Sequence, residues 1–225
     1  MSKILIAYAT TEGQTKKIAN TIADWLRSSG NVVDVHDTAQ TQPEPVLAEY
    51  SFYILAGSLH MRNHQGALIR FTQKHADILS LKPSLLLSVS ATGSRNDPKS
   101  MADAEACIKM FVEQTGFLPT ESIPIGGAIK YTKYNFILRA IMKGISAKEG
   151  GPTDTTRDHE LTDWTALRAT IDRFVDKYTA APPAPVEAKK NCCGKCGGKG
   201  DCGGDGHEHH RELHHLVAVP KAQSK

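Results

Sequence analysis

A short polar loop near the N-terminus carries residue types that can hold a phosphate. Thr10, Thr11, Gly13 and Thr15 follow an apolar run and precede a stretch with helical spacing. Hydroxyls and backbone N–H groups would converge there at a helix N-terminus, which favours a phosphate dianion. The spacing matches neither a Walker loop nor a dinucleotide-binding glycine motif, so a nucleotide triphosphatase is disfavoured. An ordinary helix cap, made by Thr10 or Thr11 with Glu12 near the positive helix end, explains the same residues.

Soft metal ligands crowd the C-terminal tail. The spacing of Cys193 and Cys196 lets two thiolates reach one metal ion, and the other candidate ligands are Cys192, Cys202, His207 and His209. Few apolar residues flank them, which argues against a packed zinc domain. Three interpretations stay open: an unstructured metal- or thiol-reactive tail, a specific zinc or iron–sulfur site, and a tail without a chemical role.

A basic and apolar insertion, residues 130–159, interrupts the regular pattern of the chain. Five cations occur in it before the first carboxylate, Glu149, and apolar residues recur at helical spacing between Tyr134 and Ala147. Such a helix can pack on a sheet edge or dimerise. It can also touch an anionic lipid surface while its apolar face enters the headgroup region.

The elements that would position these residues alternate between strands and helices. Short runs rich in Ile, Leu and Val predict strands that are buried on both faces, and apolar residues three and four apart predict helices between them. The alternation predicts an α/β fold, a doubly wound five-stranded parallel sheet with helices on both sides. The expected strands are 3–8, 32–36, 52–56, 85–89 and 123–129, and two expected helices are 101–115 and 161–178.

Ligands of such a sheet bind beyond the carboxyl ends of its strands. The loops that follow these ends are Thr10–Thr15, Gly57–Gln65 and Ser90–Pro98. The second loop holds two histidines, His60 and His64. They would either be exposed to solvent or lie near a bound ligand, where a positively charged ring would stabilise negative charge on that ligand.

The composition divides the 225 residues into two parts. Residues 1–179 indicate one globular domain, whereas residues 180–225 begin with a proline-rich linker and hold four of the five cysteines. The net charge of +3 and the aromatic content of 6% argue against nucleic-acid binding. No apolar run is long enough for a membrane span. The single cysteine of the domain, Cys107, favours a reducing, cytoplasmic compartment.

Several motifs taken together resemble one family. Thr10-Thr11-Glu12-Gly13-Gln14-Thr15 is similar to the FMN phosphate loop of flavodoxins. The strand end Gly57-Ser58 and three later segments point further, namely Gly126-Gly127-Ala128-Ile129-Lys130-Tyr131, Gly150-Gly151-Pro152-Thr153-Asp154-Thr155 and Thr162-Asp163-Trp164. Over residues 3–178 the chain resembles the long-chain, flavodoxin-like protoporphyrinogen IX dehydrogenases, which pass electrons to menaquinone.

The resemblance implies that FMN is the cofactor and that three loops hold it. The first loop would bind the phosphate, the second would pass beside the isoalloxazine ring, and the third would approach the other side of the ring. Such loops normally offer an aromatic ring, whereas this chain has His60, Met61 and Arg62 in that place. The implied cofactor-binding residues are Thr10, Thr11, Glu12, Gly13, Gln14, Thr15, Gly57, Ser58, Leu59, Ser90, Ala91, Thr92 and Gly93.

The resemblance also implies a substrate, an acceptor and a location. Protoporphyrinogen IX, a flat apolar ring with two propionates, would lie against the insertion, with Lys130, Lys133 and Arg139 as propionate partners. Menaquinone or ubiquinone would take the electrons in this step of heme biosynthesis. Because these quinones are dissolved in lipid, the insertion would bring a cytoplasmic enzyme to the inner face of the cell membrane as a peripheral protein.

Three other functions fit parts of the sequence. A flavodoxin-type electron carrier would have an acidic docking face, and the basic insertion argues against it. An NAD(P)H:quinone reductase of the same fold needs no nicotinamide fingerprint. A metal-handling protein would act through its tail and would lose its function on deletion of residues 182–225.

Overall fold

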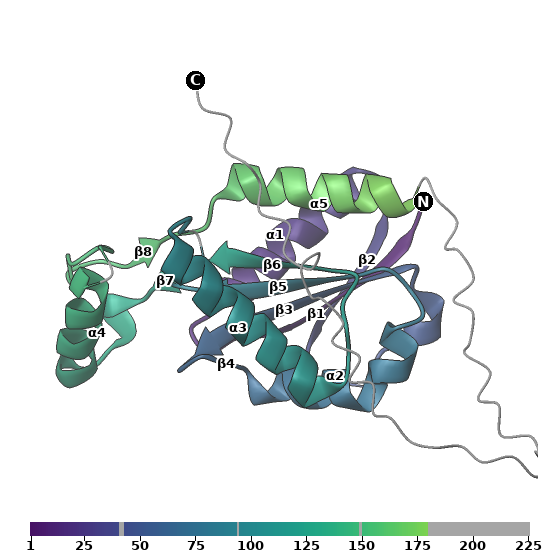
Figure 1. The fold of residues 1–225 in the computed structure, drawn as a ribbon. Coiled ribbons are helices and arrows are strands. Elements are labelled where there is room, and N and C mark those ends of the chain that lie inside the picture. Colours follow the sequence, from purple (N-terminus) through teal and green to yellow (C-terminus); the bar gives the residue numbers. More distant parts are fainter. Residues whose placement is uncertain (41–42, 94, 149, 180–225) are drawn as a thin grey trace, which may run out of the picture.

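The computed structural model describes residues 1–40, 43–93, 95–148 and 150–179. Within this part a central sheet is covered by helices on both faces (Figure 1). The predicted division of the chain near residue 180 stays a prediction. Outside the described residues lie the candidate metal ligands Cys192, Cys193, Cys196, Cys202, His207 and His209.

Five parallel strands form the main sheet in the order β2-β1-β3-β5-β6. This arrangement confirms the predicted doubly wound, five-stranded parallel sheet. A short strand, β4, adds an antiparallel pair to the end of β3. The strand order reverses between β1 and β3, which places a ligand-binding switch point at their carboxyl ends. The bounds are β1 (Lys3–Ala9), β2 (Val32–Asp37), β3 (Phe52–His60), β4 (Asn63–His64), β5 (Ser84–Ser90) and β6 (Glu121–Gly126).

Helices cover the sheet in two layers (Figure 1). Residues of α1 and α5 pack in one apolar core with the strands, and residues of α2 and α3 pack in another on the opposite face. The bounds are α1 (Gln14–Ser28), α2 (Gly66–Leu79), α3 (Pro98–Thr115) and α5 (Trp164–Thr179), and a 3-10 turn, η1 (Leu47–Glu49), precedes β3.

Alternate residues of each strand supply the two cores. On β1, Ile4 and Ile6 belong to the core under α1 and α5, whereas Leu5 and Ala7 belong to the core under α2 and α3. All four side chains are fully buried. A strand that is covered on both faces needs apolar residues at every position, which explains the continuous apolar run in the sequence.

The last strand of the sheet, β6, pairs with β5 and has no other partner strand among the described residues, so it lies at an edge. Pro124 stands in the middle of this strand, opposite Ser88. A proline has no N–H to donate and is therefore tolerated in an edge strand, where one row of N–H groups faces away from the sheet.

Between β6 and α5 the chain leaves the sheet and forms an arm, residues 128–160. It contains β7 (Ala128–Ile129), η2 (Tyr131–Lys133), α4 (Phe136–Lys148) and β8 (His159–Glu160). β7 and β8 pair antiparallel, so the arm leaves and returns at the same place. The predicted strand 123–129 is wrong at its end, because the chain breaks at Gly127. The N–H of Gly127 donates to Ser90 O, 2.8 Å away, and its carbonyl accepts from Leu161 N at 2.9 Å.

Helix α4 stands away from the sheet at the far end of the arm (Figure 1). Among its described residues only Ser146 is buried. Exposed apolar side chains, with 40% to 81% of their surface in solvent, are Phe136, Ile137, Leu138, Ile141 and Ile145. A cluster of this kind marks an interaction surface. None of the described helices is both long and apolar enough to cross a membrane.

Candidate functional site

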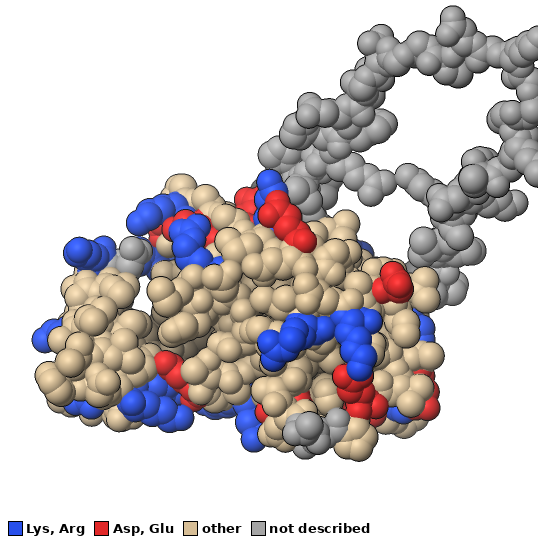
Figure 2. Space-filling model, turned by 90° about the horizontal axis from the view of Figure 1, so that it is seen from below, with Lys and Arg blue, Asp and Glu red and all other residues tan. Residues whose placement is uncertain are grey.

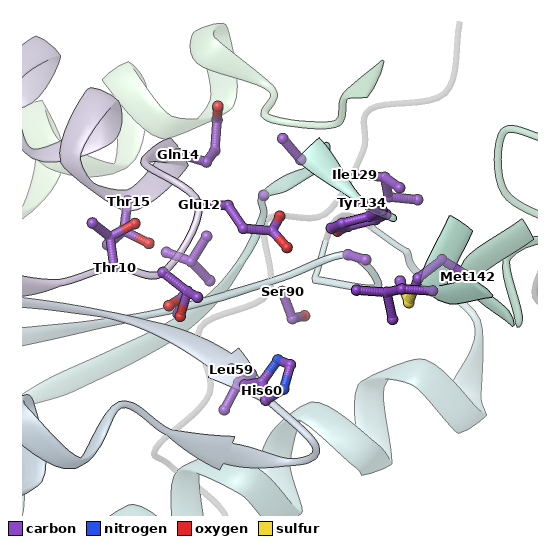
Figure 3. Close-up of a pocket in the computed structure, with 17 residues that line it drawn as sticks. Thr10, Glu12, Gln14, Thr15, Leu59, His60, Ser90, Ile129, Tyr134 and Met142 are labelled. Atoms are coloured by element: carbon purple, nitrogen blue, oxygen red, sulfur yellow. The ribbon is translucent and has the colours of Figure 1, made fainter. Parts of the chain in front are cut away.

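The carboxyl ends of three strands and the arm enclose a pocket (Figure 3). The loop after β1, the end of β3 and the end of β5 form one side, as the topology of a parallel sheet requires. Ile129, Tyr134 and Met142 of the arm form the other side. Every implied cofactor residue lines this pocket except Gly13, Gly57, Thr92 and Gly93.

The loop from Thr10 to Thr15 leaves the start of α1 open for an anion. The residue before the helix is Gly13, whose φ of +93° lies in the left-handed region, and no side chain of the described residues caps the helix. The N–H of Gly13 donates to Thr10 Oγ1 at 3.0 Å. Thr10 and Thr11 therefore do not act as an ordinary helix cap. The first N–H groups of α1 remain without intrahelical acceptors, which suits a phosphate.

Thr15 provides a direct test of whether these residues fit a phosphate. Its side chain is 1% exposed, and its hydroxyl has no hydrogen-bond partner among the described residues. A buried hydroxyl without a partner costs free energy unless a ligand satisfies it. The open helix start and the unsatisfied hydroxyl both fit the phosphate group of FMN.

The side chain of Gln14 points away from the pocket, toward the base of the arm (Figure 3). Its amide donates to Glu160 Oε1 at 2.7 Å and to Thr162 Oγ1 at 3.0 Å. Lys17 donates to both oxygens of Glu160, at 2.9 and 2.8 Å. Burial would raise the pKa of Glu160, but the hydrogen bonds from Lys17 and Gln14 outweigh it and lower that pKa. Gln14 therefore offers a phosphate its backbone N–H, and its side chain ties the loop to the arm.

The end of β3 brings its backbone close to the pocket. A Cβ atom at Gly57 would lie 2.7 Å from Leu68 Cδ2 and 3.0 Å from His64 Cδ2, so a larger residue would force these two side chains to move. The next residue, Ser58, lines the pocket with a buried hydroxyl that has no partner among the described residues. This tight packing of Gly57 sets the position of Ser58 and Leu59.

A two-residue turn, Met61 and Arg62, joins β3 to β4. Both residues have positive φ angles, +50° and +67°. Residues other than glycine adopt such angles at a cost in free energy. The exposed His60 lines the pocket just before this turn. Arg62 Nη1 pairs with Asp103 Oδ1 of α3 at 2.9 Å and anchors the turn.

The two histidines of this loop differ sharply. His64 is 5% exposed, its ring packs 4.9 Å from that of Phe111, and its Nε2 lies 3.1 Å from Ser88 Oγ. Burial lowers the pKa of His64 to about 4, so the ring is neutral near pH 7. The predictions of an exposed His64, or of a positive one beside the flavin, are both wrong. His60 alone keeps a place at the pocket.

The loop after β5 is held against the neighbouring strand. A Cβ atom at Gly93 would lie 2.2 Å from Ile125 O of β6, which leaves room for glycine alone. Ser90 and Ala91 line the pocket, whereas Thr92 faces an adjoining cavity. Ser90 and Ala91 therefore lie at the pocket, and their implied role beside the flavin stays a prediction.

The arm contributes an aromatic side chain to the lining of the pocket. Tyr134 lines the pocket beside Glu12 (Figure 3). Burial raises the pKa of Tyr134, and a hydrogen bond to the Glu12 carboxylate raises it further. Lys133 Nζ donates to the backbone oxygen of Glu12 at 3.0 Å. Tyr134 and Met142 were not predicted as site residues, although both belong to the aromatic and apolar insertion.

The three predicted propionate partners have different surroundings. Lys130 Nζ lies 3.8 Å from a carboxylate oxygen of Asp158. Arg139 donates to the carbonyls of Tyr131 and Tyr134, each at 3.1 Å, and so holds the start of α4. Lys133 reaches the rim of the pocket through its contact with Glu12. Of the three, Lys133 is the best placed to meet a ligand.

Comparison with known proteins finds related chains. Residues 5–156 match the model of a flavodoxin domain family. The chain is 33% identical over 187 residues to a protoporphyrinogen IX dehydrogenase (quinone) of Leishmania major, over 81% of this chain and 79% of the relative. It is 30% identical over 180 residues to the protein of that name in Escherichia coli K12, over 80% of this chain and 98% of the relative. The solved structure of an oxidised flavodoxin from Bacillus cereus aligns with a TM-score of 0.46 at 14% identity, over 81% of this chain and 100% of that chain.

Proposed function

This chain belongs to the flavodoxin domain family and to the quinone-dependent protoporphyrinogen IX dehydrogenases, which are oxidoreductases, and from this premise we propose its reaction. It binds FMN and oxidises protoporphyrinogen IX to protoporphyrin IX in heme biosynthesis. The electrons pass to menaquinone or ubiquinone. One observation carries the proposal, namely a pocket with the phosphate loop on one side and the arm on the other, in a chain whose relatives carry that name.

Bound FMN would supply the redox chemistry, because a flavin accepts two electrons at a time. Protoporphyrinogen IX loses six electrons and six protons on its way to protoporphyrin IX. Three cycles are therefore needed, and each cycle converts one quinone to its hydroquinone. The protein contributes binding, orientation and the exclusion of water.

The phosphate loop and the two flanking strand ends bind and orient the cofactor in this proposal. The Thr15 hydroxyl and the first N–H groups of α1 hold the phosphate. The backbone of Ser58 and Leu59 passes one side of the ring, and the backbone of Ser90 and Ala91 approaches the other side. The unsatisfied hydroxyl of Ser58 is available for a polar atom of the cofactor.

The arm closes the pocket and excludes water in this proposal. Tyr134, Leu138 and Met142 line it from α4 and the turn before it. The hydrogen bond between Tyr134 and Glu12 fixes that wall to the phosphate loop. We assign the propionate contact to Lys133 first and to Lys130 second, and we give Arg139 the task of holding the arm in shape.

Helix α4 would also bring the enzyme to lipid. In Figure 2 the end of the molecule that carries α4 is largely uncharged, with Lys and Arg at its margins. Its exposed apolar residues can enter the headgroup region, while Lys143 and Lys148 meet anionic lipid. The enzyme would then act as a peripheral protein on the cytoplasmic face of the membrane.

The test of the proposal is anaerobic mixing of the FMN-loaded protein with protoporphyrinogen IX. We expect loss of flavin absorbance, followed by its return and by porphyrin fluorescence when a menaquinone analogue is added. Porphyrin formation no faster than the uncatalysed rate would overturn the assignment. Bleaching by NAD(P)H in place of the porphyrinogen would favour the reductase.

A pair of lysine variants tests the substrate contact. Lys133→Gln should raise the KM for protoporphyrinogen about tenfold, since it removes a charged partner of a carboxylate. Lys143→Gln, on the exposed face of α4, is the matched control and should leave that KM unchanged. Equal KM values for the two variants would remove Lys133 from the substrate site.

A further inference from the structure

A second cavity of about 320 Å³ lies between the arm and the loop after β5. Its walls include Thr92 and Arg95 from that loop, Met142 and Ile145 from α4, and Pro152 and Leu161 from the return of the arm. Of the residues that the family resemblance implies for FMN or substrate, Ala91 and Thr92 line this cavity and the others do not.

The second cavity adjoins the first. Ala91, Ile129 and Met142 line both of them. A ligand in the second cavity would therefore be separated from the cofactor pocket by the thickness of shared side chains. This arrangement suits a second redox partner, because electrons must pass between the two ligands.

The far wall of the second cavity is fixed by hydrogen bonds. The carbonyl of Pro152 accepts from Tyr131 Oη at 2.9 Å and from Ser146 Oγ at 2.7 Å. Gly151 N donates to Ser146 O at 2.7 Å, and a Cβ at Gly151 would lie 2.6 Å from Ser146 Oγ. The wall is thus held in place without a ligand, as small-molecule sites usually are.

The lining suits a small and mostly apolar ligand. Most of the side chains around the cavity are apolar, and the polar groups in the same lining include the Thr92 hydroxyl and the Arg95 guanidinium, whose Nε pairs with Asp97 Oδ2 at 3.0 Å. Its volume is at the lower end of the roughly 300–1,000 Å³ of small-molecule sites. A ring with two carbonyl oxygens fits this description better than a macrocycle of four pyrroles with two propionates.

The cavity also has an apolar exit. Ile145 lines it and is still 50% exposed, and Ile141 and Ile137 follow at four-residue spacing on α4, 54% and 57% exposed. Residues four apart lie on one face of a helix. An apolar chain attached to the ring can therefore continue along the exposed face of α4 toward lipid.

From these observations we infer that the second cavity binds the ring of the quinone acceptor. The inference rests on the proposed use of a quinone as acceptor, and it adds where on the molecule that quinone binds. Protoporphyrinogen and quinone would then occupy different parts of the molecule. In each cycle two electrons and two protons leave the porphyrinogen and reach the quinone, which becomes the hydroquinone.

The test uses the FMN-loaded protein, reduced by light and mixed anaerobically with menadione, a soluble quinone without a lipid tail. Ile145→Asn places an amide in the second cavity and should raise the half-saturating menadione concentration about tenfold. Ile141→Asn is the matched control, since Ile141 is equally exposed on the same helix and lines neither cavity. It should behave like the unmodified chain.

A second measurement does not depend on turnover. With 13C-labelled methionine methyl groups, menadione should shift the NMR signal of Met142, whereas the signal of Met110 on α3 should not move. Ile145→Asn should weaken the concentration dependence of the Met142 shift. The inference would be overturned if menadione did not shift the Met142 signal. It would also be overturned if Ile145→Asn and Ile141→Asn had the same half-saturating menadione concentration.

These outcomes are separable from a failure of the proposed function. If the protein fails to oxidise protoporphyrinogen but Ile145→Asn still impairs reoxidation by menadione, the quinone site stands and the substrate assignment falls. If porphyrin forms normally and both isoleucine variants respond alike, the substrate assignment stands and the quinone site falls.

Discussion

Two buried threonines allow the phosphate assignment to be tested one hydroxyl at a time. Thr15 and Thr72 are 1% and 0% exposed, and neither hydroxyl has a partner among the described residues. Thr15→Val should lower the affinity for FMN about tenfold, because a hydrogen bond to a charged phosphate is lost. It should also stabilise the cofactor-free protein by about 1 kcal/mol, because an unsatisfied buried hydroxyl is removed. Titration of FMN into the apoprotein and urea unfolding measure the two effects.

Thr72→Val is the matched control, since Thr72 lies on α2 and outside the pocket. It should give a similar gain in stability with no change in FMN affinity. An FMN affinity of Thr15→Val equal to that of the unmodified chain would contradict the assignment of Thr15 to the phosphate.

The neutral imidazole of His64 should make the protein less stable in mild acid. Because burial lowers the pKa of His64 to about 4, the folded state binds no proton there at pH 5, whereas the unfolded chain binds one below pH 6.5. The contribution of the neutral His64 to the free energy of unfolding is fully present above pH 6.5. It is lost as the pH falls toward 4, and the loss is about 2 kcal/mol at pH 5. His64→Gln should remove this loss, as measured by urea unfolding at pH 7.5 and pH 5.

The exposed His60 supplies the comparison for that measurement. His60→Gln should retain the pH dependence of the unmodified chain, because its side chain lies in solvent in both states. If His64→Gln retained it as well, the neutral, buried imidazole would be excluded as its source.

For single residues, a role could be predicted from the sequence where it depends on the geometry of the local backbone. The open start of α1 follows from Gly13 and the threonines before it, which are neighbours in the chain. The burial of His64 depends on Phe111, far away in sequence, and the contact of Tyr134 with Glu12 depends on where the arm folds back. Such partners cannot be identified from spacing.

A substitution in the hairpin turn between β3 and β4 should make the protein more stable. Met61 and Arg62 both have positive φ, a conformation that Asn and Gly adopt more readily in two-residue hairpin turns. Met61→Asn should therefore stabilise the protein by about 0.5–1 kcal/mol in urea unfolding. Met61→Ala keeps the strained backbone and should leave the midpoint unchanged. A loss of stability in Met61→Asn would contradict the strain.

Most elements were predictable because their apolar periodicity reflects burial on one or two faces. The five parallel strands and the helix in the insertion fall close to the predicted positions. The break at Gly127 was not predictable from the sequence. It arises because the backbone of Gly127 forms hydrogen bonds with Ser90 and Leu161, and these partners are distant in the chain. The insertion contains no carboxylate before Glu149, but folding brings Asp158 to Lys130 and partly neutralises its charge.

At the scale of the whole molecule, α4 should govern attachment to lipid. Phe136 is 81% exposed, and its transfer into a headgroup region would remove apolar surface from water. Phe136→Ser should weaken sedimentation with anionic vesicles about tenfold. Added salt should weaken it further by screening the basic residues.

Leu81→Ser provides the control for the vesicle experiment. Leu81 is 60% exposed but lies before β5, at the opposite end of the strands from the arm. Its substitution should leave sedimentation unchanged. Equal losses for the two variants would place the lipid contact elsewhere on the molecule.

The proline in the edge strand bears on how copies of this chain behave when they are crowded. An exposed sheet edge is a template for a strand of another molecule, and such additions lead to aggregates. Pro124 offers no N–H to an incoming strand in the middle of β6, so a strand added along that edge would lack a hydrogen bond there. Collection on a membrane surface raises the local concentration of a protein, and this edge would resist fibrillar growth under that condition.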